Sequence, residues 1–298
     1  MNRRILLLGA AGGALAACTR RRPVVPVEPP RFVVGPAWRA GQVWFYPAEN
    51  YGYVATGLAV VQDNKSGSTA TREVWDGTAL LAAHQTLQLP CILRVTNLET
   101  GLQILVRAID RGPDSPGRVV ALSTGAGRLL GVTGQGVARV RVEIDPELSR
   151  QAVTGLAGQA TLQVAAAPRD SVRADALPPP PGIRQSLRGR SAASNPVGAS
   201  VLRDTPDSGP VVLPTEAKRV PADPGRIWLQ AGEFGRIADA ERLRARLAGG
   251  TIGQERRGRQ DTFRVGAGPY ATVSEADAAL DHALRSGVTD ARLVVETR

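Results

Sequence analysis

The chain has 298 residues, which is enough for two domains of modest size. Its formal net charge of +10 is carried almost entirely by arginine, because Lys65 and Lys218 are the only lysines. Many of these arginines lie in stretches poor in aromatic residues. The sequence therefore lacks the interleaved basic and stacking side chains of a single-strand binder, which argues against nucleic acid as a partner.

The N-terminus has the pattern of a secretory signal. Residues 2–4, Asn-Arg-Arg, form a short basic region, and residues 5–14 are apolar but too few to cross a bilayer as a helix. Leu-Ala-Ala-Cys at 15–18 then forms a lipobox, which predicts a signal peptide over residues 1–17 and a lipid anchor on Cys18. Thr19 favours the outer over the inner membrane. The alternative is an ordinary signal peptide with an incidental cysteine.

Residues 18–37 are rich in proline and have no periodic apolar pattern. They predict a stiff, extended tether, with the folded region starting near Trp38. With Cys18 acylated, Cys91 has no partner for an intramolecular disulfide. Its apolar neighbours predict a buried, small hydrophobic residue.

Residues 38–146 contain short apolar runs separated by turn residues. The strands expected from length and β-branched content are 92–96, 102–109, 119–122 and 137–144, with a hairpin connection at 97–101. The last run alternates apolar and charged residues from 139 to 144, as expected for a strand with one buried face. Helices are expected at Gly77–Ala83 and at Thr124–Leu130 after the N-cap Ser123. This region predicts a small β-rich barrel with one or two short helices.

Residues 147–225 connect the two predicted folded regions. Residues 160–164 are either a last strand or the start of a linker. From 165 to 225 the chain has four consecutive prolines at 178–181 and scattered Ser, Arg and Asp, so it has too little apolar surface to fold. We therefore assign 147–225 to a disordered linker.

The tail, residues 226–298, contains an internal repeat. Each half has a strand, a Gly-x-aromatic turn, an amphipathic helix and a further strand. The elements expected are strands at 227–231, 263–267 and 292–295 and helices at 238–247 and 275–284. Two β-α-β halves predict a four-stranded antiparallel sheet with both helices on one face. The opposite face of the sheet is then open to a ligand.

Asp110 ends a mostly apolar strand and is followed by Arg111-Gly-Pro. An aspartate before such a turn has a purely structural explanation, because it accepts main-chain N–H groups. Glu73 and His84, the histidine of this region, make Asp110 a candidate for chemistry instead. Asp76 is a second acid close to Glu73, but it can be explained structurally as the cap of a helix that starts at Gly77.

These residues lie in stretches that resemble a known family. TATREVWD (69–76), ALLAAHQTL (79–87), RVTNLETG (94–101) and DRGP (110–113) are similar to the double-psi β-barrel of the rare lipoprotein A family, the septal-ring lytic transglycosylases. QAGEF (230–234) and VGAGPY (265–270) resemble a SPOR domain. The resemblance covers nearly the whole chain and implies a six-stranded double-psi barrel followed by an α+β SPOR domain.

The resemblance implies a reaction and roles for particular residues. Lytic transglycosylases cleave the glycosidic bond of peptidoglycan with the sugar's own C6 hydroxyl and leave 1,6-anhydro-N-acetylmuramic acid ends. Such cleavage needs an acid for the leaving oxygen and a carboxylate beside the ring. Asp110 matches the family's acid/base, Glu73 its second carboxylate, and His84 its hydrogen-bonding histidine. Arg111 either fixes its loop or contacts a sugar.

Three positions differ from the family pattern. Thr71 and Arg72 stand where the family has Asn-Gly, and Ile109 replaces an asparagine before the aspartate. A glycine-dependent turn at Arg72 would be strained. These differences keep open a second hypothesis, a non-catalytic, expansin-like protein of the same architecture that binds glycan at the septum.

On the SPOR-like sheet, alternation places Trp228, Gln230 and Arg264 opposite the apolar residues, on the open face. We expect these three side chains to bind sugar, although Trp228 has the alternative of packing at the sheet edge. The expected partners are glycan strands without stem peptides, a membrane through Cys18 and, at the septum, division proteins. No cofactor or metal is expected, because the histidines and Cys91 do not form a ligand cluster. A third hypothesis, an unrelated lipoprotein whose tail joins other partners, requires both resemblances to be accidental.

Overall fold

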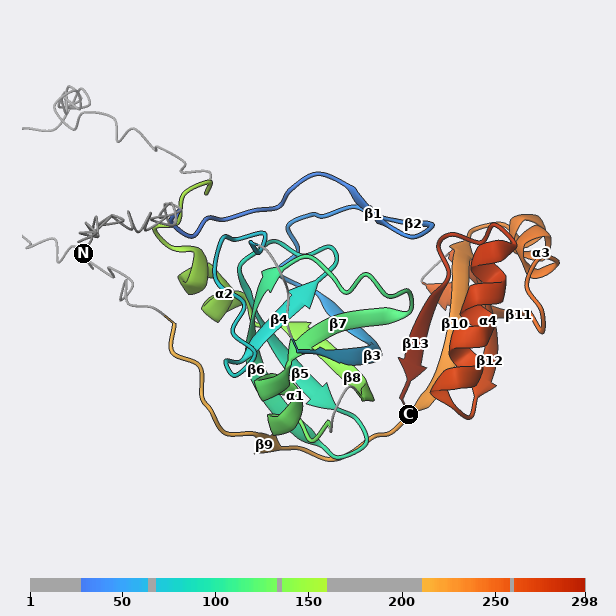
Figure 1. The fold of residues 1–298 in the computed structure, drawn as a ribbon. Helices are drawn as coiled ribbons and strands as arrows, with labels where there is room; N and C mark the ends of the chain where they lie inside the picture. Colours follow the sequence, from blue (N-terminus) through green and yellow to red (C-terminus); the bar gives the residue numbers. More distant parts are fainter. Residues whose placement is uncertain (1–27, 64–67, 133–135, 160–210, 258–259, 298) are drawn as a thin grey trace, which may run out of the picture.

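The computed structural model describes residues 28–63, 68–132, 136–159, 211–257 and 260–297 (Figure 1). The N-terminal region contains β1 (Trp38–Ala40), β2 (Val43–Phe45), β3 (Val54–Gln62), β4 (Leu81–His84), β5 (Cys91–Asn97), β6 (Leu102–Asp110), β7 (Arg118–Ser123), α1 (Thr124–Leu129), β8 (Val137–Ile144) and α2 (Pro146–Val153). The rest contains β9 (Lys218–Arg219), β10 (Arg226–Phe234), α3 (Ile237–Arg244), β11 (Thr251–Arg257), β12 (Gln260–Tyr270), α4 (Val273–Arg285) and β13 (Arg292–Glu296). Cys18 and residues 160–164 lie outside the described residues.

Six strands form a closed barrel. Their order is β4-β7-β3-β8-β5-β6, and a parallel pairing of β4 with β6 closes the ring. The β3–β7 pair is also parallel, whereas the other neighbours in the barrel are antiparallel. Closure leaves these strands without exposed edges. The predicted six-stranded double-psi barrel is confirmed.

The interior of the barrel follows the alternation in the sequence. Val140, Val142 and Ile144 of β8 are buried, as predicted. They belong to one apolar cluster with residues of the other barrel strands, including Cys91, which is 0% exposed. Burial raises the pKa of the Cys91 thiol to about 12, so the expectation of a small buried hydrophobic residue is confirmed.

One predicted barrel helix is correct, one is wrong and one was missed. Ser123 caps α1 by accepting the Ala126 N–H, as predicted. Residues 77–83 are a turn followed by β4, because strand pairing with β6 and β7 overrides the local helix preference. Helix α2 begins at Pro146 after the N-cap Asp145, so residues 146–153 are helical and the predicted start of the linker at 147 is too early.

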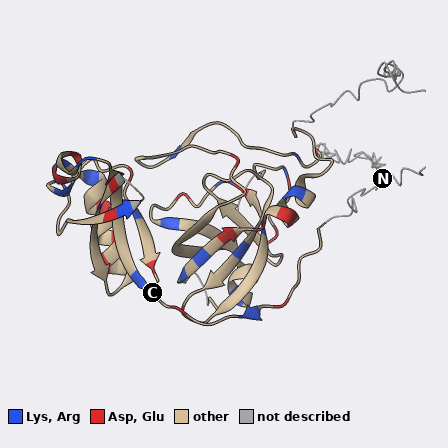
Figure 2. Ribbon diagram, turned by 180° about the vertical axis from the view of Figure 1, so that it is seen from behind, with Lys and Arg blue, Asp and Glu red and all other residues tan. Residues whose placement is uncertain are grey.

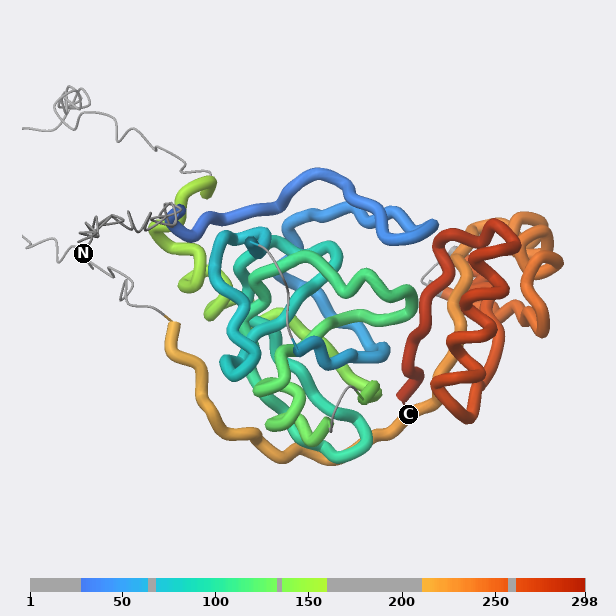
Figure 3. The backbone as a smooth tube through the Cα atoms, in the orientation of Figure 1, coloured from blue at the N-terminus to red at the C-terminus, as the bar shows by residue number. Residues whose placement is uncertain are grey.

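Segments expected to be tether or linker lie along the barrel (Figure 3). Val33 and Leu89 exchange two main-chain hydrogen bonds of 2.7 and 2.8 Å, so the packed chain begins before Trp38. β9 pairs with β6, and Gly101 has φ +71° where a Cβ atom would lie 2.1 Å from the Val220 carbonyl oxygen. Residues 28–37 and 211–225 therefore pack on the barrel, which corrects the predicted tether and the predicted linker at these positions.

The C-terminal domain is the predicted α+β unit. Its antiparallel sheet has the order β11-β12-β10-β13, and each half of the repeat supplies a strand, a helix and a strand. α3 and α4 pack on one face over Ile227, Leu229 and Val265. The Gly-x-aromatic segments lie within the ends of β10 and β12 and are not turns. Sheet, helix order and helix face are as predicted.

The two domains pack against each other along β13 (Figures 1 and 2). Leu58 of β3 belongs to the same buried cluster as Leu280 and Leu293 of the C-terminal domain. Gly117 has φ +73°, and a Cβ atom there would lie 2.7 Å from the Leu280 side chain. Arg118 and Asp277 of α4 form a two-bonded ion pair with distances of 2.7 and 2.8 Å. The interface thus combines apolar packing with the oriented Arg118–Asp277 ion pair.

Candidate functional site

Asp110 is the last residue of β6 and follows the buried alternation of Ile104, Val106 and Ala108. Its side chain is 8% exposed. The Oδ1 atom accepts two main-chain hydrogen bonds, from Ala70 N–H at 2.9 Å and from Arg111 N–H at 2.8 Å. These donors fix the orientation of the carboxyl group.

The loop before Glu73 is tied to the end of β6. Thr71 N–H donates to the Ile109 carbonyl at 3.2 Å, and Arg72 follows with φ +71°. The backbone at 72 is therefore the left-handed turn that glycine adopts without strain, and an arginine occupies it here. Arg72 Nε lies 2.7 Å from the Glu28 carboxylate. The difference in sequence thus leaves the turn in place and adds an ion pair to it.

Glu73 is held by an arginine to which the sequence assigned no role. Arg107 Nε and Nη2 donate to the two Glu73 carboxylate oxygens at 2.8 and 3.1 Å. The two side chains are about equally buried, at 20% and 21% exposed. Such a bidentate pair fixes both oxygens of the carboxylate with charge-assisted hydrogen bonds. The role of Glu73 as the second carboxylate stays a prediction.

His84 is neutral and carries its ring proton on Nε2. Its Nδ1 accepts the main-chain N–H groups of Thr86 and Leu87, both at 3.2 Å, so the ring proton is on Nε2. The side chain is 2% exposed, and burial, followed by the nearby Arg111 charge, lowers its pKa to about 3. Among the described residues Nε2 has no hydrogen-bond partner. His84 is suited to position a group by hydrogen bonding, the predicted role, and not to transfer protons at neutral pH.

Arg111 contacts the main chain. Its guanidinium donates to the carbonyl oxygens of Val34, His84 and Leu87, and burial lowers its pKa to about 10. These contacts support the structural alternative over the predicted sugar contact. Asp76 accepts hydrogen bonds from Thr78 N–H and Oγ1, both at 2.8 Å, so it caps a turn and not the expected helix.

The fold brings the three predicted catalytic residues to one end of the barrel. Ala83, next to His84, pairs with Asp110 across β4 and β6, and the 69–73 loop binds Asp110 through Ala70. A cleft of about 640 Å³ between the two domains is lined by His84 but by neither Glu73 nor Asp110. The two carboxylates and this cleft are thus distinct features.

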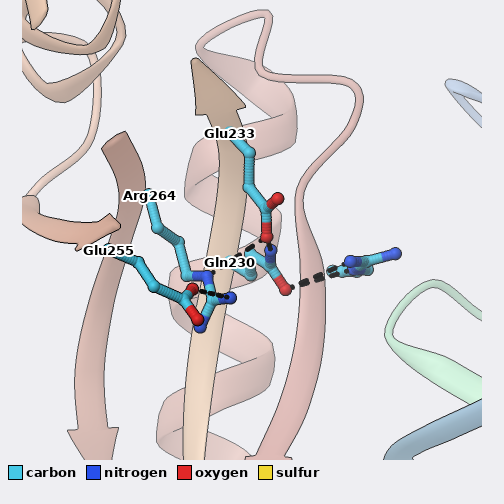
Figure 4. Close-up of polar contacts among 5 residues, drawn as sticks. Gln230, Glu233, Glu255 and Arg264 are labelled. Carbon is cyan, nitrogen blue, oxygen red and sulfur yellow. Dashed lines mark hydrogen bonds and ion pairs between the residues drawn. The ribbon is translucent and has the colours of Figure 1, made fainter. Parts of the chain in front are cut away.

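The open face of the C-terminal sheet carries a polar network (Figure 4). Arg264 donates to Glu233 and Glu255, both at 3.2 Å, and Gln230 donates to Glu233 at 2.9 Å. Arg292 donates to the Gln230 amide oxygen at 3.2 Å. Gln230 and Arg264 lie on this face, where the alternation put them, whereas the sequence did not single out Glu233, Glu255 and Arg292.

Trp228 is half-buried and lies beside Gly268, where a Cβ atom would be 3.2 Å from the indole ring.

Within the described residues no group of three or more His, Cys, Asp and Glu side chains is placed to hold a metal ion. In the same part of the chain, no helix combines the length and the apolar composition needed to cross a membrane.

Both domains match family models. Residues 54–142 match the family described as lytic transglycolase, and residues 223–291 match the SPOR domain. The protein is thus a double-psi barrel of the lytic transglycolase type joined to a C-terminal SPOR domain. The chain belongs to the rare lipoprotein A family.

Curated relatives carry the name endolytic peptidoglycan transglycosylase RlpA. The protein of Pseudomonas aeruginosa (strain UCBPP-PA14) is 35% identical over 233 residues, covering 72% of this chain and 62% of the relative. The protein of Escherichia coli (strain K12) is 33% identical over 226 residues, covering 66% and 59%. A probable RlpA of Nostoc sp. (strain PCC 7120) is 50% identical over 76 residues, covering 26% and 20%. The chain spans less than two thirds of the length of these relatives.

Proposed function

We propose that the protein is an endolytic lytic transglycosylase that cleaves peptidoglycan glycan strands lacking stem peptides. The observation that carries this proposal is the placement of Asp110, oriented by two main-chain donors, beside the loop in which Arg107 binds the Glu73 carboxylate with two hydrogen bonds. The family membership and the names of the curated relatives support the same reaction.

The reaction balances with one acid and no water. In this reaction the acid is the carboxyl group of Asp110, whose orientation is set by the two N–H groups that donate to Oδ1. Asp110 donates a proton to the leaving glycosidic oxygen as the bond to C1 of N-acetylmuramic acid breaks. The C6 hydroxyl of the same sugar then bonds to C1 and returns its proton to Asp110. The charged Glu73 stabilises the oxocarbenium character that builds at C1.

We further propose a cellular location, based on the N-terminal lipobox and the C-terminal SPOR domain. The lipobox at Cys18 would anchor the protein to the outer membrane, with the barrel and the SPOR domain in the periplasm. The SPOR domain would hold stem-peptide-free glycan at the division septum, where division proteins are candidate partners. Gln230 and Arg264 on the open sheet face are proposed sugar contacts, as is Trp228 beside them.

A non-catalytic glycan-binding protein is the second candidate. The favouring observations are the arginine at the strained position 72 and the low exposure of Asp110, 8%, outside the interdomain cleft. In this case the barrel would hold glycan without cutting it.

Mass analysis of digested glycan separates these functions. Residues 19–298 are incubated with amidase-treated, stem-peptide-free strands and, in parallel, with intact peptidoglycan. Fragments with 1,6-anhydro ends from the denuded strands support the proposal. Reducing ends would mean a hydrolase, and uncut strands retained on the protein would favour the non-catalytic function.

A further inference from the structure

The cleft between the two domains has walls from three parts of the chain. The barrel contributes Tyr53, His84 and the 116–119 segment, and the C-terminal sheet contributes Gln230 and Arg292. The β1–β2 hairpin contributes residues 43–45 and extends from the barrel toward the C-terminal domain (Figure 1). The volume of the cleft, about 640 Å³, is within the range of clefts that bind a small-molecule-sized ligand.

Trp44 presents an aromatic surface to this cleft. It is 53% exposed, although exposed tryptophan is uncommon in folded domains. The hairpin that carries it is fixed, because Trp38 stacks on Phe45 at 4.8 Å and donates from Nε1 to the Gln85 carbonyl at 2.9 Å. Val43 packs against the apolar cluster of the C-terminal domain. Trp44 is therefore held in position without being buried.

The polar lining of the cleft is balanced in charge. The arginines that line it are Arg118, Arg264 and Arg292, and the acids are Glu233, Asp290 and Glu296. His84 lines the cleft as a side chain that is only 2% exposed. An indole face together with amide and guanidinium donors suits a polyhydroxylated ring with acetamido groups. It does not suit a strongly charged or a purely apolar ligand.

We infer that this interdomain cleft is a saccharide-binding subsite in which Trp44 stacks on a sugar ring while Gln230 and Arg292 bind its polar groups. The inference rests on the proposed function and specifies how the substrate is held. One strand contacts both domains at once, so the glycan bound by the C-terminal sheet is the same strand that lies along the barrel. The Arg118–Asp277 pair holds the two walls together.

Binding of strands by the full-length chain in detergent tests the subsite. Stem-peptide-free strand fragments of defined length are titrated calorimetrically into the Asp110→Asn protein and into the same protein with Trp44→Ala. We expect Trp44→Ala to weaken binding about tenfold, as for the loss of one stacking contact. Tyr46→Ala is the matched control, because Tyr46 is 70% exposed just beyond the same hairpin and does not line the cleft. It should stay within about twofold.

Charge reversal at the domain interface gives a second test that does not depend on the hairpin. Asp277→Arg places two arginines together and should weaken strand binding, whereas Asp277→Arg combined with Arg118→Asp should restore it. Equal binding by Trp44→Ala and Tyr46→Ala, or a double reversal that binds no better than the single one, would overturn the inference. Failure of the proposed function shows separately, as an absence of anhydro-ended products from the wild-type chain.

Discussion

The two domains hold their polar residues in different ways. In the barrel, Asp110 is oriented by main-chain N–H groups and Glu73 by a bidentate arginine, and these side chains are mostly buried. On the C-terminal sheet, the charged side chains bind each other and remain 38–50% exposed. Groups fixed before the substrate arrives favour chemistry, whereas exposed groups that exchange one partner for another favour reversible binding.

Apart from a change of Asp110 itself, we expect the largest effect from loss of the Arg107–Glu73 pair. Arg107→Leu should lower the rate of anhydro-product formation about 100-fold, because the Glu73 carboxylate loses the two donors that hold it in place. Arg107→Lys should recover only part of the rate, since lysine cannot form the bidentate pair.

Arg94→Leu is the control for this experiment. Arg94 pairs with Asp145 at 2.8 Å on the same barrel, away from the 69–73 loop. A rate loss in Arg94→Leu as large as that in Arg107→Leu would mean that the effect comes from general destabilisation of the barrel.

The two histidines extend the comparison to pH. His84 is buried with a pKa near 3, so folding excludes a proton that the unfolded chain binds below about pH 6.5. The free energy of unfolding is therefore unaffected by this group above pH 6.5 and falls as the pH drops from 6.5 toward 3, by on the order of 5 kcal/mol in total. Urea unfolding between pH 7 and 4 should show this loss in the wild type and a shallower dependence in His84→Gln.

His282 on α4 is exposed and provides the matched variant. His282→Gln should keep the steep pH dependence of the wild type. If the two variants gave the same slope, the assignment of the pH dependence to His84 would be wrong.

On the C-terminal sheet, single changes should have small effects on stability. Arg264→Ala removes two exposed ion pairs, each worth about 0–1 kcal/mol, so the unfolding free energy should change little. Binding of stem-peptide-free strands should weaken roughly threefold to tenfold. Arg256→Ala, which removes the exposed pair with Asp261 on the neighbouring strand, should leave strand binding unchanged. Equal losses in the two variants would remove the sheet face from the proposed sugar contacts.

The smallest expected effect is at the strained turn. Arg72→Gly should raise the unfolding free energy by up to about 1 kcal/mol, because glycine adopts φ +71° without strain while an exposed ion pair with Glu28 is lost. Arg72→Ala loses the pair and keeps the strain, so it should be no more stable than the wild type. Thermal unfolding of both variants measures the difference.

The sequence was sufficient for features with a local cause. The strand alternation of β8, the Ser123 cap and the repeated strand-helix-strand halves of the tail all depend on neighbouring residues. The expected helix at 77–83 was wrong because β4 is a four-residue strand whose conformation depends on pairing with β6 and β7. Helix α2 was missed although Asp145-Pro146 is a local start signal.

The candidate site shows the same limit. Motif resemblance selected Asp110, Glu73 and His84, but the partner of Glu73 is 34 residues away in the sequence and required the fold. The carbonyl contacts of Arg111 and the position of Arg292 also come from long-range packing. The tautomer of His84 followed only from the two N–H groups that reach Nδ1.

The central claim is that the barrel cuts the strand and the C-terminal domain holds it. The most direct measurement compares residues 19–298 with the Asp110→Asn variant on stem-peptide-free strands, recording both anhydro-ended products and strand retention on each protein. We expect Asp110→Asn to lose at least about 100-fold in product formation and to retain strands as well as the wild type. Undiminished cleavage by Asp110→Asn, or loss of cleavage and retention together, would contradict it.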